Sequence, residues 1–278
     1  MPEVDLSAGT IEYQDTGGDG PVLVLLHGLT MDSSLWRKVL PDLRADYRCV
    51  LPTLPLGGHR LPMRPDADLS LHALGRLVAE FLDALDLRDV TLVGMDWGGA
   101  QLLISENVDH RVARLVLCAC EAFDNYPPGT AATMLARMAK VPGGLALGLL
   151  PLRSRRLRSL PATWGGMSKR GVPDEVLDAW FRPVLTQRAI RRDLRKYLCP
   201  LPDRRTLLQW AQRQRRFDRP VLVVWATEDR IMPREHGRRL AEMFPQGRLI
   251  EIDDSYTLIP EDQPAALART LRDFVGVG

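Results

Sequence analysis

A ten-residue stretch, Val90 to Gly99, constrains the fold of this chain more than any other part of the sequence. Its first four residues read Val-Thr-Leu-Val, a composition typical of a buried β-strand. Gly94, Asp96 and Gly98 follow in a Gly-x-Asp-x-Gly pattern, and a helix-like segment begins at Ala100. Glycines on both sides of Asp96 permit a turn too tight for larger side chains. The pattern predicts a sharp strand-to-helix turn that presents the Asp96 carboxylate, with the positive end of the helix helping to keep it ionised.

The composition is that of an ordinary globular chain. It has 278 residues, of which 45% are hydrophobic and 26% charged, and a net charge of +2, which gives no reason to expect a polyanionic partner. The polar, acidic N-terminus predicts no signal peptide, and the most apolar stretch, Val141 to Leu152, is too short to span a bilayer. The four cysteines lack the spacing of a disulfide framework. We therefore expect a cytoplasmic protein with no membrane or nucleic-acid partner.

Strand-like and helix-like segments alternate on both sides of a central interruption. Val4 to Asp15 predicts an antiparallel hairpin at a sheet edge. A continuous apolar run at residues 22–26 indicates a buried parallel strand, and residues 112–118 and 220–225 are predicted to form further strands. Residues 34–43 suggest a helix, and apolar residues at helical spacing span residues 69–85. This alternation predicts an α/β fold whose mostly parallel sheet is covered by helices on both faces.

The interruption, residues 126–205, contains helix-like segments broken by Pro and Gly and no strand-like run. Between residues 131 and 205 there are 16 Lys and Arg against 5 Asp and Glu, a net charge of +11, so the remainder carries about −9. The shift predicts a helical cap inserted into a core formed by residues 1–125 and 206–278. A solvated outer face explains the charge most simply; attraction of an anionic substrate and weak surface association remain open.

These features resemble the α/β-hydrolase superfamily along nearly the whole chain. The sequence Asp-Trp-Gly-Gly at residues 96–99 resembles in particular the haloalkane dehalogenase and epoxide hydrolase branch. The resemblance implies a small, largely apolar substrate and no cofactor or metal. Asp96 would attack an electrophilic carbon and form an alkyl ester as a halide or epoxide oxygen leaves. It also implies an oxyanion hole made by the backbone N–H groups of Leu29, which follows a His-Gly pair, and Trp97.

The same resemblance implies two supporting acids. Asp229, on the loop after the strand at residues 220–225, matches the acid that orients a catalytic histidine. Glu121, at the end of the strand that follows the elbow helix, matches a second acid position used in some dehalogenases. Either carboxylate would hold the catalytic base in place for water activation.

The substrate pocket has four aromatic candidates. Dehalogenases often have Asn where Leu29 stands, so Trp97 is left as the side-chain donor for a halide. Epoxide hydrolases open the ring with two cap tyrosines, and Tyr197 together with Tyr126 forms the candidate pair here. Trp164 is a candidate for the apolar wall of the pocket.

The catalytic histidine of that family is missing. Counting back from Glu261-Asp262 places Thr257 at its position, and a one-residue slip places Tyr256 there. Neither side chain is a base near neutral pH, so we expect hydrolysis of the ester to be slow or absent. His59, on a loop near the expected mouth of the site, and Glu121 are the alternative acid or base candidates.

Three functions therefore remain open. The first is hydrolysis of a carbon–halogen or epoxide bond with Asp96 as nucleophile. The second is a lyase, isomerase or cyclase reaction with Asp96 as general acid or base, which needs no histidine. The third is a ligand-binding protein that keeps the hydrolase scaffold and has lost turnover.

Overall fold

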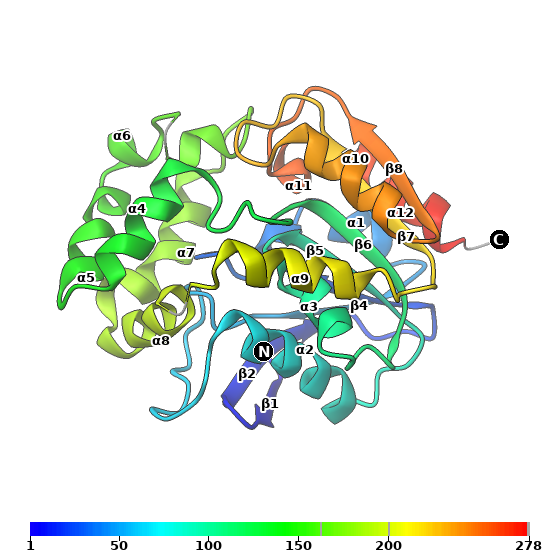
Figure 1. Cartoon of the computed structure of the whole chain (residues 1–278), viewed down its shortest axis with the longest axis horizontal. Coiled ribbons are helices and arrows are strands. Elements are labelled where there is room, and N and C mark those ends of the chain that lie inside the picture. Colours follow the sequence, from blue (N-terminus) through cyan, green and yellow to red (C-terminus); the bar gives the residue numbers. More distant parts are fainter. Residues whose placement is uncertain (162, 200, 277–278) are drawn as a thin grey trace.

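An eight-stranded sheet forms the centre of the molecule (Figure 1). The computed structural model describes residues 1–161, 163–199 and 201–276. The strands lie in the order β1-β2-β4-β3-β5-β6-β7-β8; β1 and β2 are antiparallel to their neighbours and the remaining pairs are parallel. Their bounds are β1 Glu3–Leu6, β2 Gly9–Asp15, β3 Val22–Leu26, β4 Arg48–Pro52, β5 Val90–Asp96, β6 Val112–Cys120, β7 Val221–Ala226 and β8 Gly247–Ile252.

Strand β5 lies in the interior of this sheet, between β3 and β6. All seven of its residues are buried, as expected for a parallel strand covered on both faces. Alternate residues face opposite sides, so Leu92 packs in one apolar cluster and Val93 in the other. The carboxyl end of β5, whose last residue is Asp96, is therefore enclosed by the core.

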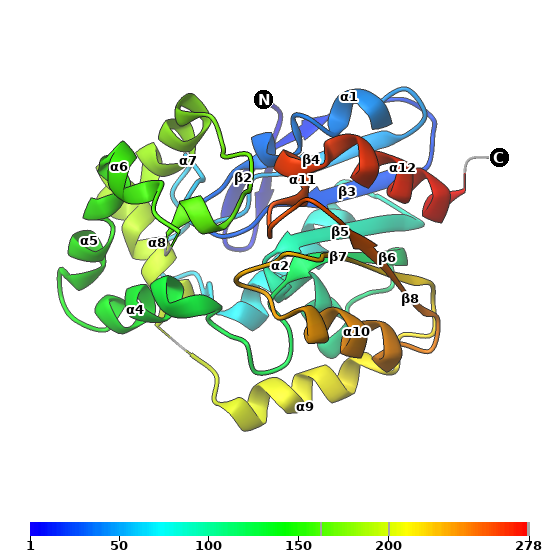
Figure 2. The same ribbon diagram turned by 90° about the horizontal axis from the view of Figure 1, so that it is seen from above.

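Helices cover both faces of the sheet (Figure 2). One face is covered by α2 (Leu71–Ala84), α3 (Leu102–Ser105), α9 (Arg204–Gln214) and α10 (Arg234–Met243). The other is covered by α1 (Leu40–Leu43) and α12 (Pro264–Val275), with the short α11 (Ile259–Asp262) before it. Each buried leucine of these helices stabilises the fold by roughly 1.5–3 kcal/mol. The predicted α/β fold is confirmed.

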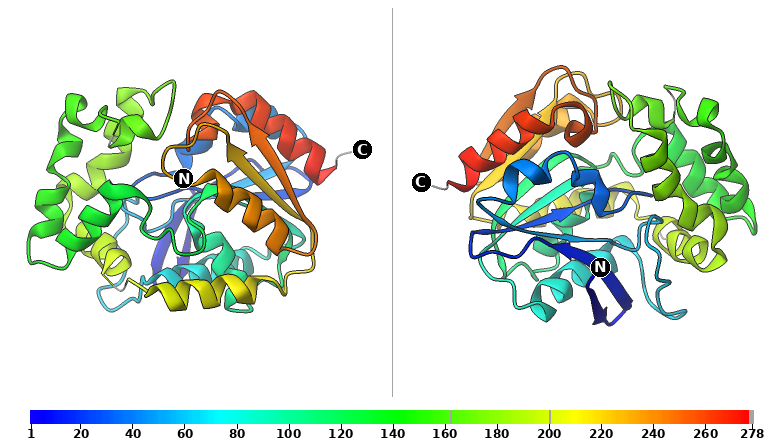
Figure 3. Two further views of the ribbon diagram at one scale, coloured as in Figure 1. Left: turned by 45° about the horizontal axis from the view of Figure 1, so that its top comes forward. Right: turned by 180° about the vertical axis from the view of Figure 1, so that it is seen from behind.

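The α-helices between β6 and α9, called the cap helices below, form a group at one end of the sheet, and both views in Figure 3 place the C-terminal helix α12 at the other end. They are α4 (Gly129–Ala139), α5 (Gly144–Gly148), α6 (Arg155–Arg158), α7 (Asp174–Thr186) and α8 (Arg188–Leu198). All of them fall between β6 and β7, inside the interval 126–205 that the sequence assigns to an insertion. None of the helices in the described part of the chain is long and apolar enough to cross a membrane.

Two helices expected from the sequence are broken in the structure. The elbow helix expected from Ala100 begins as a 3-10 helix at Gly98–Gln101 and continues as α3. The segment at residues 34–43 divides into a 3-10 helix, Ser33–Trp36, and α1. Adjacent glycines in the first case and a proline inside the second segment disfavour a continuous α-helix, which explains both differences.

Candidate active site

Asp96 stands at a sharp backbone bend. Its φ is +62°, a left-handed conformation that costs a non-glycine residue about 1–3 kcal/mol, so the surrounding structure must hold it there. The residue is 8% exposed, and its Oδ2 accepts a hydrogen bond from the Leu29 N–H at 3.1 Å. A Cβ added at Gly28 would lie 2.2 Å from that oxygen, so only glycine permits this close approach. The loop after β3 therefore touches the candidate nucleophile directly.

The second backbone donor expected from the sequence is engaged elsewhere. The Trp97 N–H donates to the Met95 carbonyl at 2.6 Å, because the positive φ of Asp96 folds the chain into a three-residue turn. The expectation that this N–H faces a substrate oxyanion is thus not met in this structure. Leu29 alone of the two expected N–H groups points at the Asp96 carboxylate.

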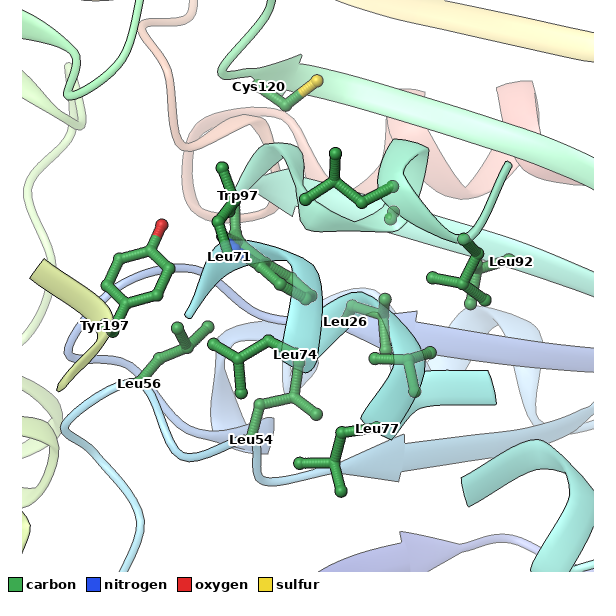
Figure 4. Packing of buried hydrophobic residues seen from close by; sticks show 14 of the residues in the cluster. Leu26, Leu54, Leu56, Leu71, Leu74, Leu77, Leu92, Trp97, Cys120 and Tyr197 are labelled. Carbon is green, nitrogen blue, oxygen red and sulfur yellow. The ribbon is translucent and has the colours of Figure 1, made fainter. Parts of the chain in front are cut away.

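Three buried hydrogen-bond donors lie in the region of Asp96: the Trp97 indole N–H and the hydroxyls of Tyr126 and Tyr197. The indole N–H has no partner among the described residues, whereas the two phenol hydroxyls interact with each other, which engages at most one of their two protons. Figure 4 shows Tyr197 reaching from the cap toward the buried cluster that holds Trp97. The two tyrosine rings meet edge to face, with centroids 6.2 Å apart. Leaving a buried donor unpaired costs about 1–3 kcal/mol, so the arrangement indicates a place for a polar ligand atom.

The tyrosine pair lies in the electrostatic field of the two neighbouring carboxylates. Burial raises the pKa of Tyr197 well above its usual value, and the charges of Glu121 and Asp96 raise it further. Burial likewise raises the pKa of Tyr126, with a further contribution from Glu121. Both phenols therefore keep their protons at neutral pH and can donate them.

Asp229 lies on the loop after β7, where the sequence places the orienting acid. Its Oδ1 accepts the N–H groups of Ile231 and Met232 and the hydroxyl of Thr257, each at 2.8 Å. Thr257 is fully buried. Tyr256 faces elsewhere, because its N–H donates to Asp262 and its ring lies under the Arg230 guanidinium. Thr257, not Tyr256, is therefore the side chain that meets the acid.

The surroundings of the Asp96 carboxyl group shift its pKa. Burial raises its pKa from 3.8 to about 7, the Leu29 N–H opposes that shift, and the charge of Asp229 adds to it. Burial also raises the pKa of Asp229, against the hydrogen bonds from Met232, Ile231 and Thr257. An acid with a pKa near 7 is about half ionised at neutral pH, which suits both nucleophilic attack and proton transfer.

This pKa predicts a pH-dependent stability difference between the wild type and Asp96→Asn. The folded chain holds the Asp96 proton more tightly than the unfolded chain, so its contribution is complete below about pH 4 and is lost as the pH rises through about 7. The full shift corresponds to about 4 kcal/mol. Urea unfolding should show Asp96→Asn gaining stability over the wild type by up to that amount between about pH 4 and pH 8.

Asp15→Asn is the control for this measurement. Hydrogen bonds from the Arg48 guanidinium lower the Asp15 pKa against partial burial, and Arg48 does not titrate in this range. The contribution of Asp15 is therefore nearly complete at about pH 4 and should stay almost flat over the same range. If the difference in unfolding free energy between Asp96→Asn and the wild type were also independent of pH, the raised pKa of Asp96 would be contradicted.

The remaining candidates have different environments. The Glu121 N–H donates to the Asp96 carbonyl at 3.0 Å, so the predicted second acid is adjacent to the elbow. His59 accepts the Gly57 N–H and faces Asp193 through its other ring nitrogen, at 3.3 and 3.4 Å. Because both ring nitrogens are engaged, His59 is a poor water activator.

Trp164 is placed in the packing of the cap. Its ring contacts those of Trp180 and Phe181, with centroids 5.7 and 5.0 Å apart, rather than the tyrosine pair. The sequence alone does not tell whether an aromatic residue of a helical cap lines the substrate pocket or packs in the core of the cap. Its predicted pocket role has no support in these contacts.

Gln101 is a site residue that the sequence analysis missed. It is 3% exposed, and its Nε2 donates to the Glu121 carbonyl at 2.9 Å. Together with Glu121 and Tyr126 it lines a small cavity of about 40 Å³. A polar residue between Ala100 and Leu102 in an otherwise apolar segment is the signal that was available.

A family model described as the alpha/beta hydrolase fold matches residues 21–264. Haloalkane dehalogenase 2 of Mycobacterium tuberculosis is 28% identical, over 98% of this chain and 93% of its own length. The cis-3-alkyl-4-alkyloxetan-2-one decarboxylase of Xanthomonas campestris is 26% identical, over 95% and 92%.

Solved structures give the same picture of the fold. A putative ancestral haloalkane dehalogenase superposes with a TM-score of 0.77 at 21% identity, covering 99% of this chain and 98% of that one. Haloalkane dehalogenase DbeA from Bradyrhizobium elkani superposes with a TM-score of 0.76 at 20% identity, covering 98% and 95%. At these identities the likeness establishes architecture and leaves the chemistry to the site.

Proposed function

Because the chain belongs to the alpha/beta hydrolase fold family, we propose that it is an enzyme in which Asp96 attacks a small, largely apolar electrophile and forms an alkyl ester. The observation that carries this proposal is the pairing of one bent, buried carboxylate with buried donors whose protons are not all engaged, namely the Trp97 indole N–H and the Tyr126–Tyr197 hydroxyl pair. A nucleophile needs an acceptor of the leaving group's charge in the same site. The similarity of this chain to haloalkane dehalogenases is consistent with this chemistry.

The proposed first step is a displacement at an sp³ carbon. An oxygen of the ionised Asp96 carboxylate forms a C–O bond while the bond to the leaving group breaks. A leaving oxygen receives a proton or hydrogen bonds from Tyr126 and Tyr197, whereas a halide is received by the Trp97 indole N–H. With a pKa of about 7, roughly half of the Asp96 carboxyl groups are ready to attack at neutral pH.

The donor arrangement favours a strained oxygen ring over a halide as the electrophile. Two phenol hydroxyls from the ends of the cap insertion meet at one place, and an oxygen atom accepts two such hydrogen bonds. A halide would have the single Trp97 indole, because Leu29 offers no side-chain donor. We therefore rank epoxides and β-lactones above haloalkanes as substrates.

The fate of the ester depends on Thr257. Its hydroxyl donates to Asp229 Oδ1, Asp229 Oδ2 is buried without a partner among the described residues, and a threonine hydroxyl does not remove a proton from water near neutral pH. A general base typically contributes about 10²–10⁴-fold to such a step. We expect simple epoxide or haloalkane esters of Asp96 to persist or to hydrolyse slowly.

A lyase reaction is the second candidate, and Thr257 is the observation that favours it. Asp96 attacks the oxygen-bearing sp³ ring carbon of a β-lactone, and the ring C–O bond breaks to release a carboxylate. Loss of CO₂ then sends its electron pair into a new C=C bond and expels the Asp96 carboxylate. This sequence consumes no water and needs no histidine. The decarboxylase relative, whose printed substrate is an oxetan-2-one, adds weight to this alternative.

Intact-protein mass spectrometry tests both candidates. The protein is incubated separately with a terminal alkyl epoxide, a primary alkyl bromide and a dialkyl β-lactone, and alkene, diol and bromide are assayed alongside. We expect a covalent adduct with the epoxide, or alkene release from the β-lactone, and neither in Asp96→Asn. Asp193→Asn is the control for a buried aspartate outside the site. Absence of adduct and product with all three probes, or retention of either in Asp96→Asn, would overturn the proposal.

A further inference from the structure

Exposed apolar side chains are concentrated in the cap. Eight large hydrophobic residues of the described chain are prominently exposed, and six of these lie between residues 134 and 160. Leu147 in α5 is 62% exposed and Leu150, just beyond it, is 45% exposed. Val141, before α5, is 59% exposed. Single exposed leucines are ordinary, but a group on one part of a small cap indicates an interaction surface.

A basic groove lies beside these side chains. It has a volume of about 1030 Å³ and runs between the start of α5 and helix α8. Its cations come from α8, and its apolar walls include Pro142, Leu145 and Ala146. The cations are Arg188, Arg191, Arg192, Arg195 and Lys196. Among the described residues that line the groove none is acidic, so its charge is strongly positive.

Most of these cations are held by carbonyl groups and not by carboxylates. Arg191 donates to the Val184 carbonyl at 3.0 Å and Arg195 to the Ala139 carbonyl at 2.7 Å. Lys196 donates to the Pro65 carbonyl at 2.7 Å. Carbonyl oxygens orient a cation without neutralising it, so these charges act on whatever approaches the cap. Arg192 differs, because it pairs with Asp193.

The apolar and basic side chains belong to one continuous surface. A second, smaller cavity of about 110 Å³ shares Ala146 and Arg191 with the basic groove and is also lined by Leu150 and Arg153. Leu147 precedes Leu150 by three residues along a continuous helical path from α5 through Leu149 into the 3-10 helix Leu150–Arg153, so the two exposed leucines are neighbours. We define the basic–apolar face as Leu147, Leu150, Arg188, Arg191 and Arg195.

We propose that the basic–apolar face binds the surface of anionic phospholipid bilayers. Exposed Leu147 and Leu150 enter the acyl boundary while the neighbouring arginines meet lipid phosphates, which is how peripheral proteins combine apolar burial with charge attraction. A solvated outer face, the simplest explanation from the sequence, leaves the exposed leucines unexplained. A second copy of the chain docked through the same face is disfavoured as the occupant, because that face would present the same positive charge.

This inference differs from the sequence-based expectation of no membrane partner. The sequence shows the excess of Lys and Arg but not that exposed leucines share a surface with them. It is also independent of the proposed reaction, since no residue of the face belongs to the site around Asp96. A cap held at a bilayer would bring the enzyme to the phase in which small apolar molecules concentrate.

Vesicle flotation tests the proposal with the full-length protein. Vesicles of phosphatidylcholine alone are compared with vesicles that also contain phosphatidylglycerol, at low and high salt. We expect partitioning into the anionic vesicles that weakens as salt rises. Arg188→Gln with Arg195→Gln should weaken it about 25-fold, at about fivefold per charge. Leu147→Ser should weaken it about tenfold.

Matched variants on the core distinguish binding by this face from effects of net charge and of exposed apolar residues in general. Arg44→Gln with Arg269→Gln removes the same two charges, and Ile250→Ser removes an exposed apolar residue from β8. Both should bind like the wild type. The proposal fails if anionic vesicles do not bind at low salt, or if the core variants lose as much binding as the cap variants. It also fails if the cap variants bind vesicles normally and instead abolish self-association or binding of an acidic protein.

Discussion

Replacing Thr257 with histidine is expected to turn a slow or stalled enzyme into one that releases product from an epoxide. The new imidazole would meet Asp229, whose Oδ1 already accepts the Thr257 hydroxyl at 2.8 Å and two backbone N–H groups. An oriented imidazole is a base near neutral pH, and such a base contributes about 10²–10⁴-fold. We therefore expect the Asp96 adduct to become short-lived and diol release to rise by about that factor.

Tyr256→His is the matched control for this experiment. It places the same side chain one residue earlier, where the backbone N–H binds Asp262 and the ring packs against Arg230. It should leave the lifetime of the adduct unchanged. Adding Asp229→Asn to Thr257→His should remove most of the gain, since the imidazole would lose its charged partner. Equal diol release by both histidine variants, with circular dichroism showing both folded, would refute the assigned position.

The second large effect is expected from the tyrosine pair. Tyr126→Phe with Tyr197→Phe removes both hydroxyls and keeps the rings, so the edge-to-face packing at 6.2 Å persists. Losing the groups that protonate the leaving oxygen should slow adduct formation with an epoxide by about 10²–10⁴-fold. Adduct formation with an alkyl bromide should change little, because bromide leaves without a proton.

Tyr47→Phe is the control for removing a buried phenol hydroxyl. Its hydroxyl is also buried without a partner in the described structure, and its ring belongs to the apolar cluster on the other side of the sheet. Single-turnover rates by intact mass should match the wild type for both electrophiles. A loss of epoxide and bromide reactivity to the same extent in the double variant would assign the tyrosines a packing role only.

The elbow and its loop were predictable because short-range rules determine them. A buried strand followed by Gly-x-Asp-x-Gly allows few backbone paths, and the strained φ of Asp96 is one of them. The meeting of Leu29 with Asp96 also follows from the sheet, since parallel strands bring their carboxyl ends to one edge.

Other parts of the site depend on contacts that no sequence pattern expresses. The turn that occupies the Trp97 N–H depends on one backbone dihedral, and the choice between Tyr256 and Thr257 depends on a one-residue register. Separating Tyr197 from Trp164 as a pocket residue requires knowing how the cap seats on the core. These three features are set by packing between residues that are far apart in the sequence, and local sequence preferences do not report on such packing.

The tyrosine contact has a consequence for how the protein becomes reactive. Tyr126 precedes the first cap helix, α4, and Tyr197 lies near the end of the last, α8. The two ends of the cap insertion must therefore come together before the two rings can touch. Without the folded cap, the sheet alone would lack the phenol groups that assist departure of the leaving oxygen. The cap must therefore be fully folded before the protein reaches its full reactivity toward strained oxygen rings.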